Sequence, residues 1–409
     1  MGDIVKSINK IDLFSPYVFI GTILLYVLFG IIGFYYQIKG LKAPSLDTYL
    51  YILFGSCFFL LGLTLPKVIY KLNFKKLNYF NVFFKYLTHK KDNIHYYNSQ
   101  NKEKLNIRNF SKLEITLLVI VISGLLFQAL NLFYSGGIPI LSGYLKAKAV
   151  TKIWIISYLL FLPGINILMA KFARKYYYLL LIIGIILFAL TGYRTTTIVI
   201  ILSAFITLYY TRTFSKNLKW IYLTIFIFGL AGIGLLVGYV SVKSIEWQQW
   251  NLNPLELFFY RAGYTLTVFD KLIGLQGATN GTLSYYSIMG FFESADPRVI
   301  VGDVVLGYKH SSTSTIFGPA LLDFGTWALA LQMFILGLIL KLMHLIQKQK
   351  KGIFTAFYAV ILAQTLVWIE TGPTDLVVWI FYFISIGLIL YAFRNHDDYR
   401  ENELDEEIS

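Results

Sequence analysis

The chain has 409 residues, of which 57% are hydrophobic and 18% aromatic, while only 14% are charged. Soluble globular proteins carry about 25% charged residues, so this composition excludes a protein whose whole surface faces water. The formal net charge of +14 could alone indicate a nucleic-acid partner, but in so apolar a chain it indicates cationic loops between membrane spans and no nucleic acid. The single cysteine, Cys57, excludes a disulfide framework and a zinc site built from cysteines.

Ten apolar segments approach the length of roughly 20 residues that a helix needs to cross a bilayer. In chain order they cover residues 17–36, 48–65, 113–134, 153–170, 176–192, 195–210, 220–240, 325–346, 353–370 and 377–393. The sequence therefore predicts an all-α polytopic membrane protein, a single integral domain over residues 1–409 with about ten transmembrane helices.

The fifth and sixth segments are nearly continuous, and only Thr191-Gly-Tyr-Arg194 separates them. One helix of some 35 residues would bury Arg194 at the bilayer centre, at a cost of about 3 kcal/mol or more. We therefore predict the tip of a tight helical hairpin there, with one long helix as the alternative.

The distribution of lysine and arginine predicts the orientation. The first apolar run lacks a small-residue cleavage site, so we expect a retained anchor with the N-terminus inside. Ten spans then return the C-terminus to the cytoplasm. With this orientation 25 Lys and Arg residues lie inside and 11 outside, which together account for all 36. This bias follows the positive-inside rule and predicts a multi-pass protein of the cytoplasmic (inner) membrane.

Two loops are long and differ in composition. Residues 66–112 form a basic cytoplasmic loop and residues 394–409 a cytoplasmic tail, and we expect the acidic end of this tail, residues 402–409, to be disordered. Residues 241–324 form a large external loop between the seventh and eighth spans, in which charges of both signs alternate with aromatic residues. Such a mixture suits saccharides, so this loop is the expected catalytic and substrate-binding segment. Asn253-Pro254 predicts a helix start there, in an amphipathic helix at the outer interface.

Several chemistries lack the residues that they need. The cores of the ten segments contain no Asp, Glu, Lys or Arg, which argues against an ion-driven transporter. No Asp-x-Asp motif occurs in the external segments, and a metal site at Glu293 and Asp296 would rest on one pair of acids. His310 is the only external histidine, so a catalytic zinc site lacks partners. We expect neither a metal nor a cofactor.

External cations remain, and they suit an anionic lipid head group. They are Arg194, Arg261, Arg298, Lys146, Lys148 and Lys309. Arginine binds phosphate oxygens with two parallel hydrogen bonds, and cations that stabilise a departing diphosphate can make a metal dispensable. His310 could then act as the base that takes a proton from a sugar hydroxyl.

Each of these residues also has a plainer interpretation. Arg194 could anchor the hairpin tip at the head groups, and Arg261 could pair with Glu256 or Asp270. Arg298 could form a surface ion pair with Asp296. The three lysines could contact lipid phosphate, and His310 could be an ordinary exposed residue.

Several local features, in this order and all expected at the outer face, carry a resemblance. They are Ser135-Gly-Gly-Ile-Pro139, Gly192-Tyr-Arg194, Tyr260-Arg261, Ser312-Thr-Ser-Thr-Ile-Phe-Gly318 and Asp323-Phe-Gly325. With the spans and the large external loop, the chain resembles the oligosaccharide repeat unit polymerases, the O-antigen or capsule polymerases of the Wzy type.

The resemblance implies a glycosyltransferase that moves a growing glycan from a polyprenyl diphosphate onto an incoming lipid-linked repeat unit. It implies an inverting, metal-independent reaction at the outer face, with Arg194 and Arg261 on the diphosphate and His310 as base. Tyr260, Tyr264, Arg298, Lys309, Lys146 and Lys148 are then expected to bind substrate. Membrane lipids, a chain-length regulator and a flippase are the further partners implied. An O-antigen ligase and, from another class, a lipid-linked oligosaccharide flippase stay open as alternatives.

Overall fold

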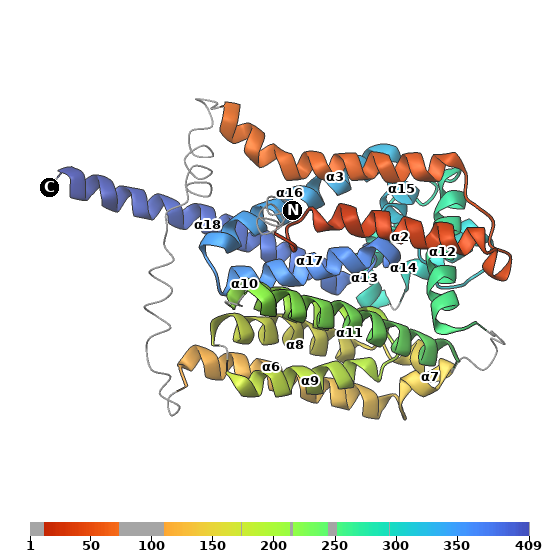
Figure 1. Cartoon of the computed structure of the whole chain (residues 1–409), viewed down its shortest axis with the longest axis horizontal. Coiled ribbons are helices and arrows are strands. Elements are labelled where there is room, and N and C mark those ends of the chain that lie inside the picture. The colour runs from red at the N-terminus through yellow and green to blue at the C-terminus, as the bar shows by residue number, and fades with distance from the viewer. Residues whose placement is uncertain are drawn as a thin grey trace.

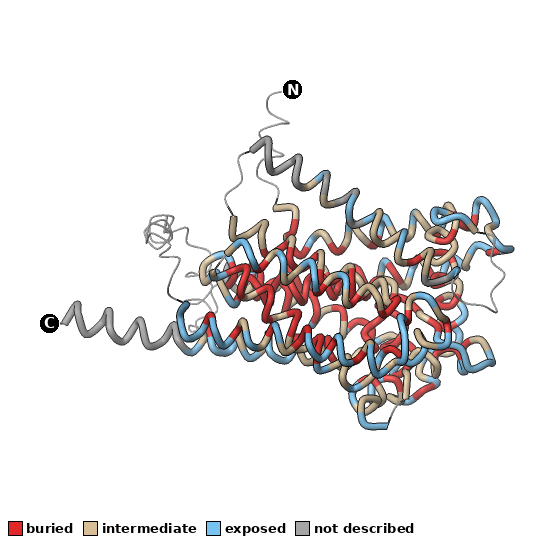
Figure 2. Tube along the Cα trace, turned by 90° about the horizontal axis from the view of Figure 1, so that it is seen from below, coloured by how far each residue is buried: buried red, intermediate tan, exposed pale blue. Residues whose placement is uncertain are grey.

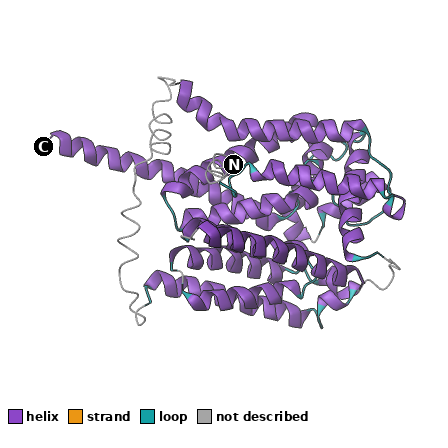
Figure 3. Cartoon of the chain, viewed as in Figure 1, coloured by secondary structure: helices purple, strands orange, loops and turns teal. Residues whose placement is uncertain are grey.

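The computed structural model describes residues 12–72, 110–172, 174–212, 216–243, 252–293 and 295–408. Within these ranges all regular secondary structure is helical, as Figure 3 shows. The all-α prediction is confirmed for this part of the chain. Most of the basic loop 66–112 lies outside it.

A helix stands at each of the ten predicted segments. They are α2 (Val18–Tyr35), α3 (Leu46–Leu72), α6 (Lys112–Tyr134), α8 (Lys152–Lys171), α9 (Lys175–Ala189), α10 (Arg194–Thr211), α11 (Lys216–Lys243), α16 (Thr326–Gln349), α17 (Ile353–Thr371) and α18 (Leu376–Ile408). Eight of them are long and apolar enough to cross a membrane. The described apolar stretches of α9 and α11, Lys175–Ala189 and Ala231–Val240, are shorter, so ten crossings stay a prediction.

The long helices run side by side, and α17 lies among them (Figure 1). α17 contacts α8, α10, α16 and α18, and most of its residues are buried. Figure 2 shows the buried residues along the centre of the bundle. Leucines on the outer helices are exposed, for example Leu24, Leu126 and Leu331. An apolar outer surface over a packed core is what a membrane-embedded bundle requires.

Glycines allow two pairs of helices to approach closely. A Cβ at Gly62 of α3 would lie 2.2 Å from the carbonyl oxygen of Phe334, and one at Gly337 of α16 would lie 2.3 Å from that of Phe59. Gly124 of α6 has a similar contact with Phe161 of α8. Such close backbone contacts favour association of helices in lipid, because burying apolar surface contributes little free energy there.

Both described ends of the chain lie at the same end of the bundle. Asp12 accepts hydrogen bonds from Lys348 and His344 near the end of α16, and α18 leaves the bundle on that side (Figure 1). This agrees with termini on one side of the membrane. That this side is cytoplasmic stays a prediction from the charge distribution. α18 continues through Ile408, so the expected disorder is wrong for residues 402–408. Its glutamate-rich sequence favours helix, and extending an existing helix avoids the cost of nucleation.

The long loop after α11 is largely folded, and its helices gather toward the opposite end of the bundle (Figure 1). They are α12 (Pro254–Ile273), α13 (Thr282–Glu293), α14 (Pro297–Leu306) and α15 (Gly318–Phe324). Asn253 and Glu256 form a reciprocal capping box around Pro254, which confirms the predicted helix start. α12 packs one face against α2 at Gly30 and Gly33.

Two buried or half-buried carboxylates hold this region together. Asp323 accepts hydrogen bonds from the backbone of Leu283 and Ser284 at 2.9 and 2.7 Å, at the start of α13. Asp270 of α12 accepts from Ser45 and Thr48 at the start of α3. Both anions face the positive end of a helix dipole, so they fix the loop to the bundle and serve structure.

Candidate functional site

The hairpin between α9 and α10 places Arg194. α9 ends at Ala189, and Gly192 has a left-handed φ of +76°. A Cβ at Gly192 would lie 3.3 Å from Cα of Ile140 and 3.4 Å from Cδ of Lys146. Glycine is thus favoured by both conformation and space. The predicted tip is confirmed, and the alternative of one long helix is wrong.

Arg194 and Arg261 converge on one carboxylate oxygen. Nη2 of Arg194, at the start of α10, pairs with Oε1 of Glu370 near the end of α17. Nη2 of Arg261, from α12, lies 3.2 Å from the same oxygen. The sequence suggested Glu256 or Asp270 as the partner of Arg261, but Glu256 is engaged in the capping box and Asp270 at the start of α3.

Arg194 and Glu370 each carry a charge that the dipole of their own helix disfavours. A cation is disfavoured at a helix N-terminus and an anion at a helix C-terminus. Their pairing offsets both costs. The side chains retain 16% (Arg194), 19% (Glu370) and 39% (Arg261) of their surface, so the group is partly accessible.

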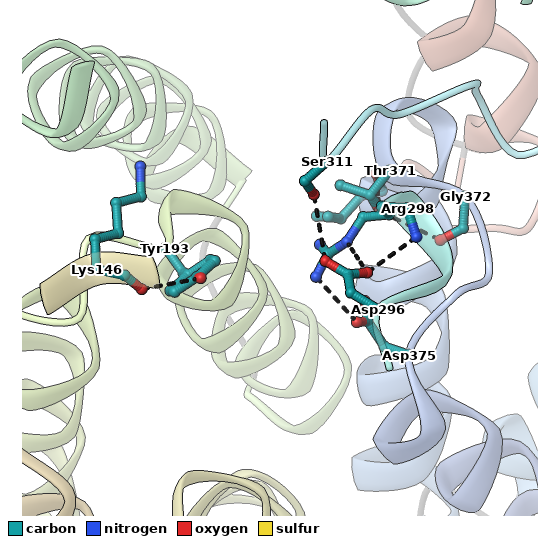
Figure 4. Close-up of polar contacts among 9 residues, drawn as sticks. Lys146, Tyr193, Asp296, Arg298, Ser311, Thr371, Gly372 and Asp375 are labelled. Carbon is teal, nitrogen blue, oxygen red and sulfur yellow. Dashed lines mark hydrogen bonds and ion pairs between the residues drawn. The ribbon is translucent and has the colours of Figure 1, made fainter. Parts of the chain in front are cut away.

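Lys146 of α7 (Gly143–Lys148) adds a third cation. Burial, followed by the charges of Arg261 and Arg194, lowers the pKa of Lys146 to about 8. The Tyr193 hydroxyl donates to the Lys146 carbonyl at 3.1 Å, and the two residues appear together in Figure 4. Among the described residues, Arg194, Arg261 and Lys146 place three cationic side chains in this region with the Glu370 carboxylate. We call Arg194, Arg261, Lys146 and Glu370 the cation site.

A second polar cluster faces Tyr193 (Figure 4). Arg298 Nε lies 3.1 Å from Oδ1 of Asp296, and its Nη2 lies 3.9 Å from Oδ1 of Asp375. The Asp296 side chain also accepts from the backbone N–H of Arg298 and so caps α14. The predicted Arg298–Asp296 pair is therefore present, with Asp375 as a further partner. Although burial lowers the pKa of Arg298, the two aspartates outweigh it, and the net shift is upward.

The two predicted tyrosines lie on α12 beside Arg261. The rings of Tyr260 and Tyr264 stack at 5.9 Å with an interplanar angle of 22°. Burial raises the pKa of Tyr264 to about 12, with a contribution from Tyr308. Stacked, half-buried rings next to the cation site are suited to the C–H face of a sugar.

The remaining predicted residues lie at the surface. His310 and Lys309 are exposed after α14, and the His310 ring lies 6.1 Å from that of Tyr308. Lys148 is exposed, with its ammonium 4.1 Å from the centre of the Tyr144 ring. The described residues include no group of three or more His, Cys, Asp or Glu side chains that could hold a metal ion.

Sequence reasoning did not select Glu370, Asp375 or Tyr193. Glu370 stands at the end of an apolar segment and Asp375 in the short link to the next one, positions that look like ordinary span edges. No spacing motif joins them to Arg194 or Arg298. A weak signal existed in Gly192-Tyr-Arg194, because Tyr193 sits inside that motif.

Comparison with known proteins identifies the family. The family described as "Putative O-antigen polymerase" matches residues 12–382. Two proteins of Methanocaldococcus jannaschii, both described as uncharacterized, are similar to the chain. One is 28% identical over 295 residues, which cover 71% of this chain and 79% of the relative. The other is 24% identical over 225 residues, which cover 55% of this chain and 51% of the relative. No solved structure matches the chain.

The family match spans nearly the whole bundle and includes the cation site, since residues 146, 194, 261 and 370 all lie within it. It agrees with the resemblance seen in the sequence motifs. The chain is a multi-pass membrane protein and belongs to the O-antigen polymerase family.

Proposed function

We propose that this protein joins polyprenyl-diphosphate-linked oligosaccharide repeat units into a surface polysaccharide. The transfer takes place at the outer face of the cytoplasmic membrane, inverts the anomeric centre and needs no metal. The membrane lipids surround the bundle, and a flippase must first deliver the repeat unit. A chain-length regulator is a further proposed partner.

The observation that carries this proposal is the convergence of Arg194 and Arg261 on Glu370. These residues come from α10, α12 and α17, which are far apart in sequence. Two guanidinium groups with Lys146 form an accessible cationic site that a lipid diphosphate could bind. Because a departing diphosphate gains negative charge, cations already held in place stabilise the transition state more than the ground state.

The saccharide end of the donor extends past the diphosphate, and the Tyr260–Tyr264 stack on α12 is proposed to bind it. Arg298 and the exposed Lys309 and Lys148 are proposed to contact more distal groups or lipid phosphate. Polymerisation is preferred to ligation because of the family to which the chain belongs. Both reactions would use the same cation site.

The proposal is tested by deleting the gene and examining surface glycan on a gel. The deletion strain should carry single repeat units on lipid, and the wild-type gene should restore a ladder of polymers. Arg261→Ala should fail to restore it, with a loss of about 100-fold or more for an electrostatic contact made in the transition state. Lys271→Ala removes an exposed cation from the same helix and should restore the ladder.

Expression and membrane insertion of each variant are checked by immunoblot of the membrane fraction. A normal ladder with Arg261→Ala would remove the cation site from the mechanism. A normal ladder in the deletion strain itself would refute polymerase activity.

A further inference from the structure

We propose that Asp375 is the general base that takes the proton from the attacking sugar hydroxyl of the acceptor. This inference rests on the proposed function, since it names a further catalytic residue for the same transfer. It assigns the Asp296–Arg298–Asp375 cluster to the acceptor and the cation site to the donor diphosphate.

Two short chain segments place these clusters side by side. Arg194 belongs to the cation site, and the preceding residue, Tyr193, faces the Asp296–Arg298–Asp375 cluster (Figure 4). Glu370 likewise belongs to the cation site, and Asp375 follows it after the turn Thr371–Thr374. Each segment thus contributes one residue to the cation site, and its other residue either faces the second cluster, as Tyr193 does, or belongs to it, as Asp375 does. The two clusters are therefore neighbours, as a leaving group and a base on opposite sides of one anomeric carbon must be.

The other carboxylates nearby are occupied. Glu370 is bound by two guanidinium groups, so it is a poor proton acceptor. Asp296 accepts from the backbone and Nε of Arg298 and from Ser311 at 3.3 Å. Among the described residues, the Asp375 carboxylate has one ion-pair contact, the long 3.9 Å contact with Arg298, and its side chain keeps 45% of its surface. It is the carboxylate in this group with the most capacity to accept a proton.

The environment of Asp375 also suits a base. Burial raises the pKa of Asp375, and this effect outweighs the charge of Arg298, while Asp296 adds to it. The charged and titratable groups that face Asp375 are Arg298 and Asp296 at the start of α14, Tyr193 before α10, and Tyr158 of α8.

The chemical step balances with these groups alone. The acceptor oxygen forms a bond to the anomeric carbon while the bond from that carbon to the diphosphate oxygen breaks. The bonding electron pair leaves with the diphosphate, which the cation site binds. The hydroxyl proton passes to the Asp375 carboxylate and then to water. No oxidant, reductant or metal takes part in this scheme.

The experiment uses the full chain in lipid nanodiscs and two probes. Farnesyl diphosphate reports binding at the cation site, and lipid-linked saccharide purified from the deletion strain reports transfer. Asp375→Asn should bind farnesyl diphosphate as the wild type does but transfer about 10²–10⁴-fold more slowly, the range for loss of a general base. Asp303→Asn, which changes an exposed carboxylate on α14, should leave both unchanged.

Two readouts separate a base from a merely structural carboxylate. Wild-type turnover should fall on acidification as Asp375 is protonated, and Asp375→Asn should lack that acidic limb. Azide attacks carbon without a base, so it should raise donor consumption by Asp375→Ala at least about tenfold and yield a glycosyl azide. Asp375→Glu should recover part of the transfer rate.

The outcomes distinguish this inference from the proposed function. Near-normal transfer by Asp375→Asn, together with loss of transfer by His310→Ala, would assign the base to His310 and overturn only this inference. Lost farnesyl diphosphate binding by Asp375→Asn, with no azide rescue of Asp375→Ala, would make the residue structural. Failure of the wild type both to bind farnesyl diphosphate and to transfer would overturn the proposed function as well.

Discussion

Arg194 and Glu370 each occupy a helix end where the helix dipole disfavours their charge, and only tertiary contact makes both tolerable. The sequence was sufficient to select Arg194 and Arg261, because external arginines are few. It could not select Glu370, since the pairing depends on how α10, α12 and α17 meet in space. The same holds for Asp375, whose role depends on the position of Arg298 and Tyr193.

At the residue scale, Lys146 predicts a pH dependence. With a pKa of about 8, Lys146 loses its proton between pH 7 and 9, whereas the arginines stay charged. Affinity for farnesyl diphosphate should therefore fall about tenfold over this range, the size of one charge-assisted hydrogen bond. Lys146→Arg should retain its charge and abolish the fall. Farnesyl diphosphate itself titrates in the same way with the wild type and with Lys146→Arg. An equal loss of affinity in the two proteins would therefore exclude Lys146 as the responsible group.

At the scale of elements, hydrophobic segments located the ten helices that stand at the predicted spans, and turn residues located the hairpin tip and the start of α12. The helices within the long external loop were harder to predict from the sequence. The start of α13, for example, is held by Asp323 of α15, and no local pattern connects these residues. The shortness of α9 and of the described apolar part of α11 also leaves the number of crossings a prediction.

The α3–α16 contact supplies a prediction at this scale. Gly337→Val would place a side chain about where the carbonyl of Phe59 lies, and backbone cannot yield as a side chain does. The helices should separate, at a cost of about 1–3 kcal/mol, and the thermal midpoint of the purified protein should fall. Gly21→Val on α2, where no atom lies within 4 Å of the added Cβ, is the matched control. Equal midpoints for the two variants would mean that the close contact is absent.

For the whole molecule, composition and charge already indicated a polytopic bundle, and the structure adds that the loop helices and the cation site share one end. Asp12 and the exit of α18 lie at the other end. The +14 charge is thus best explained by topology. In the segments predicted to be external, 11 Lys and Arg residues stand against 10 Asp and Glu residues, so binding of an anionic lipid head there would depend on a few placed cations.

Orientation is testable with a membrane-impermeant maleimide in a Cys57→Ser background. Lys309→Cys, beside the loop helices, should be labelled on intact cells. Lys351→Cys, between α16 and α17, should be labelled only after the membrane is permeabilised. The reverse pattern would place the cation site in the cytoplasm and would contradict transfer at the outer face.

The most direct test of the central claim is elongation by the purified protein in nanodiscs, with lipid-linked saccharide from the deletion strain and a metal chelator present. The wild type should lengthen the glycan and release one polyprenyl diphosphate for each linkage formed. Arg261→Ala should be at least about 100-fold slower, while Lys271→Ala should match the wild type. Wild-type turnover by Arg261→Ala, or elongation without release of polyprenyl diphosphate, would contradict the assignment of the cation site to the departing diphosphate.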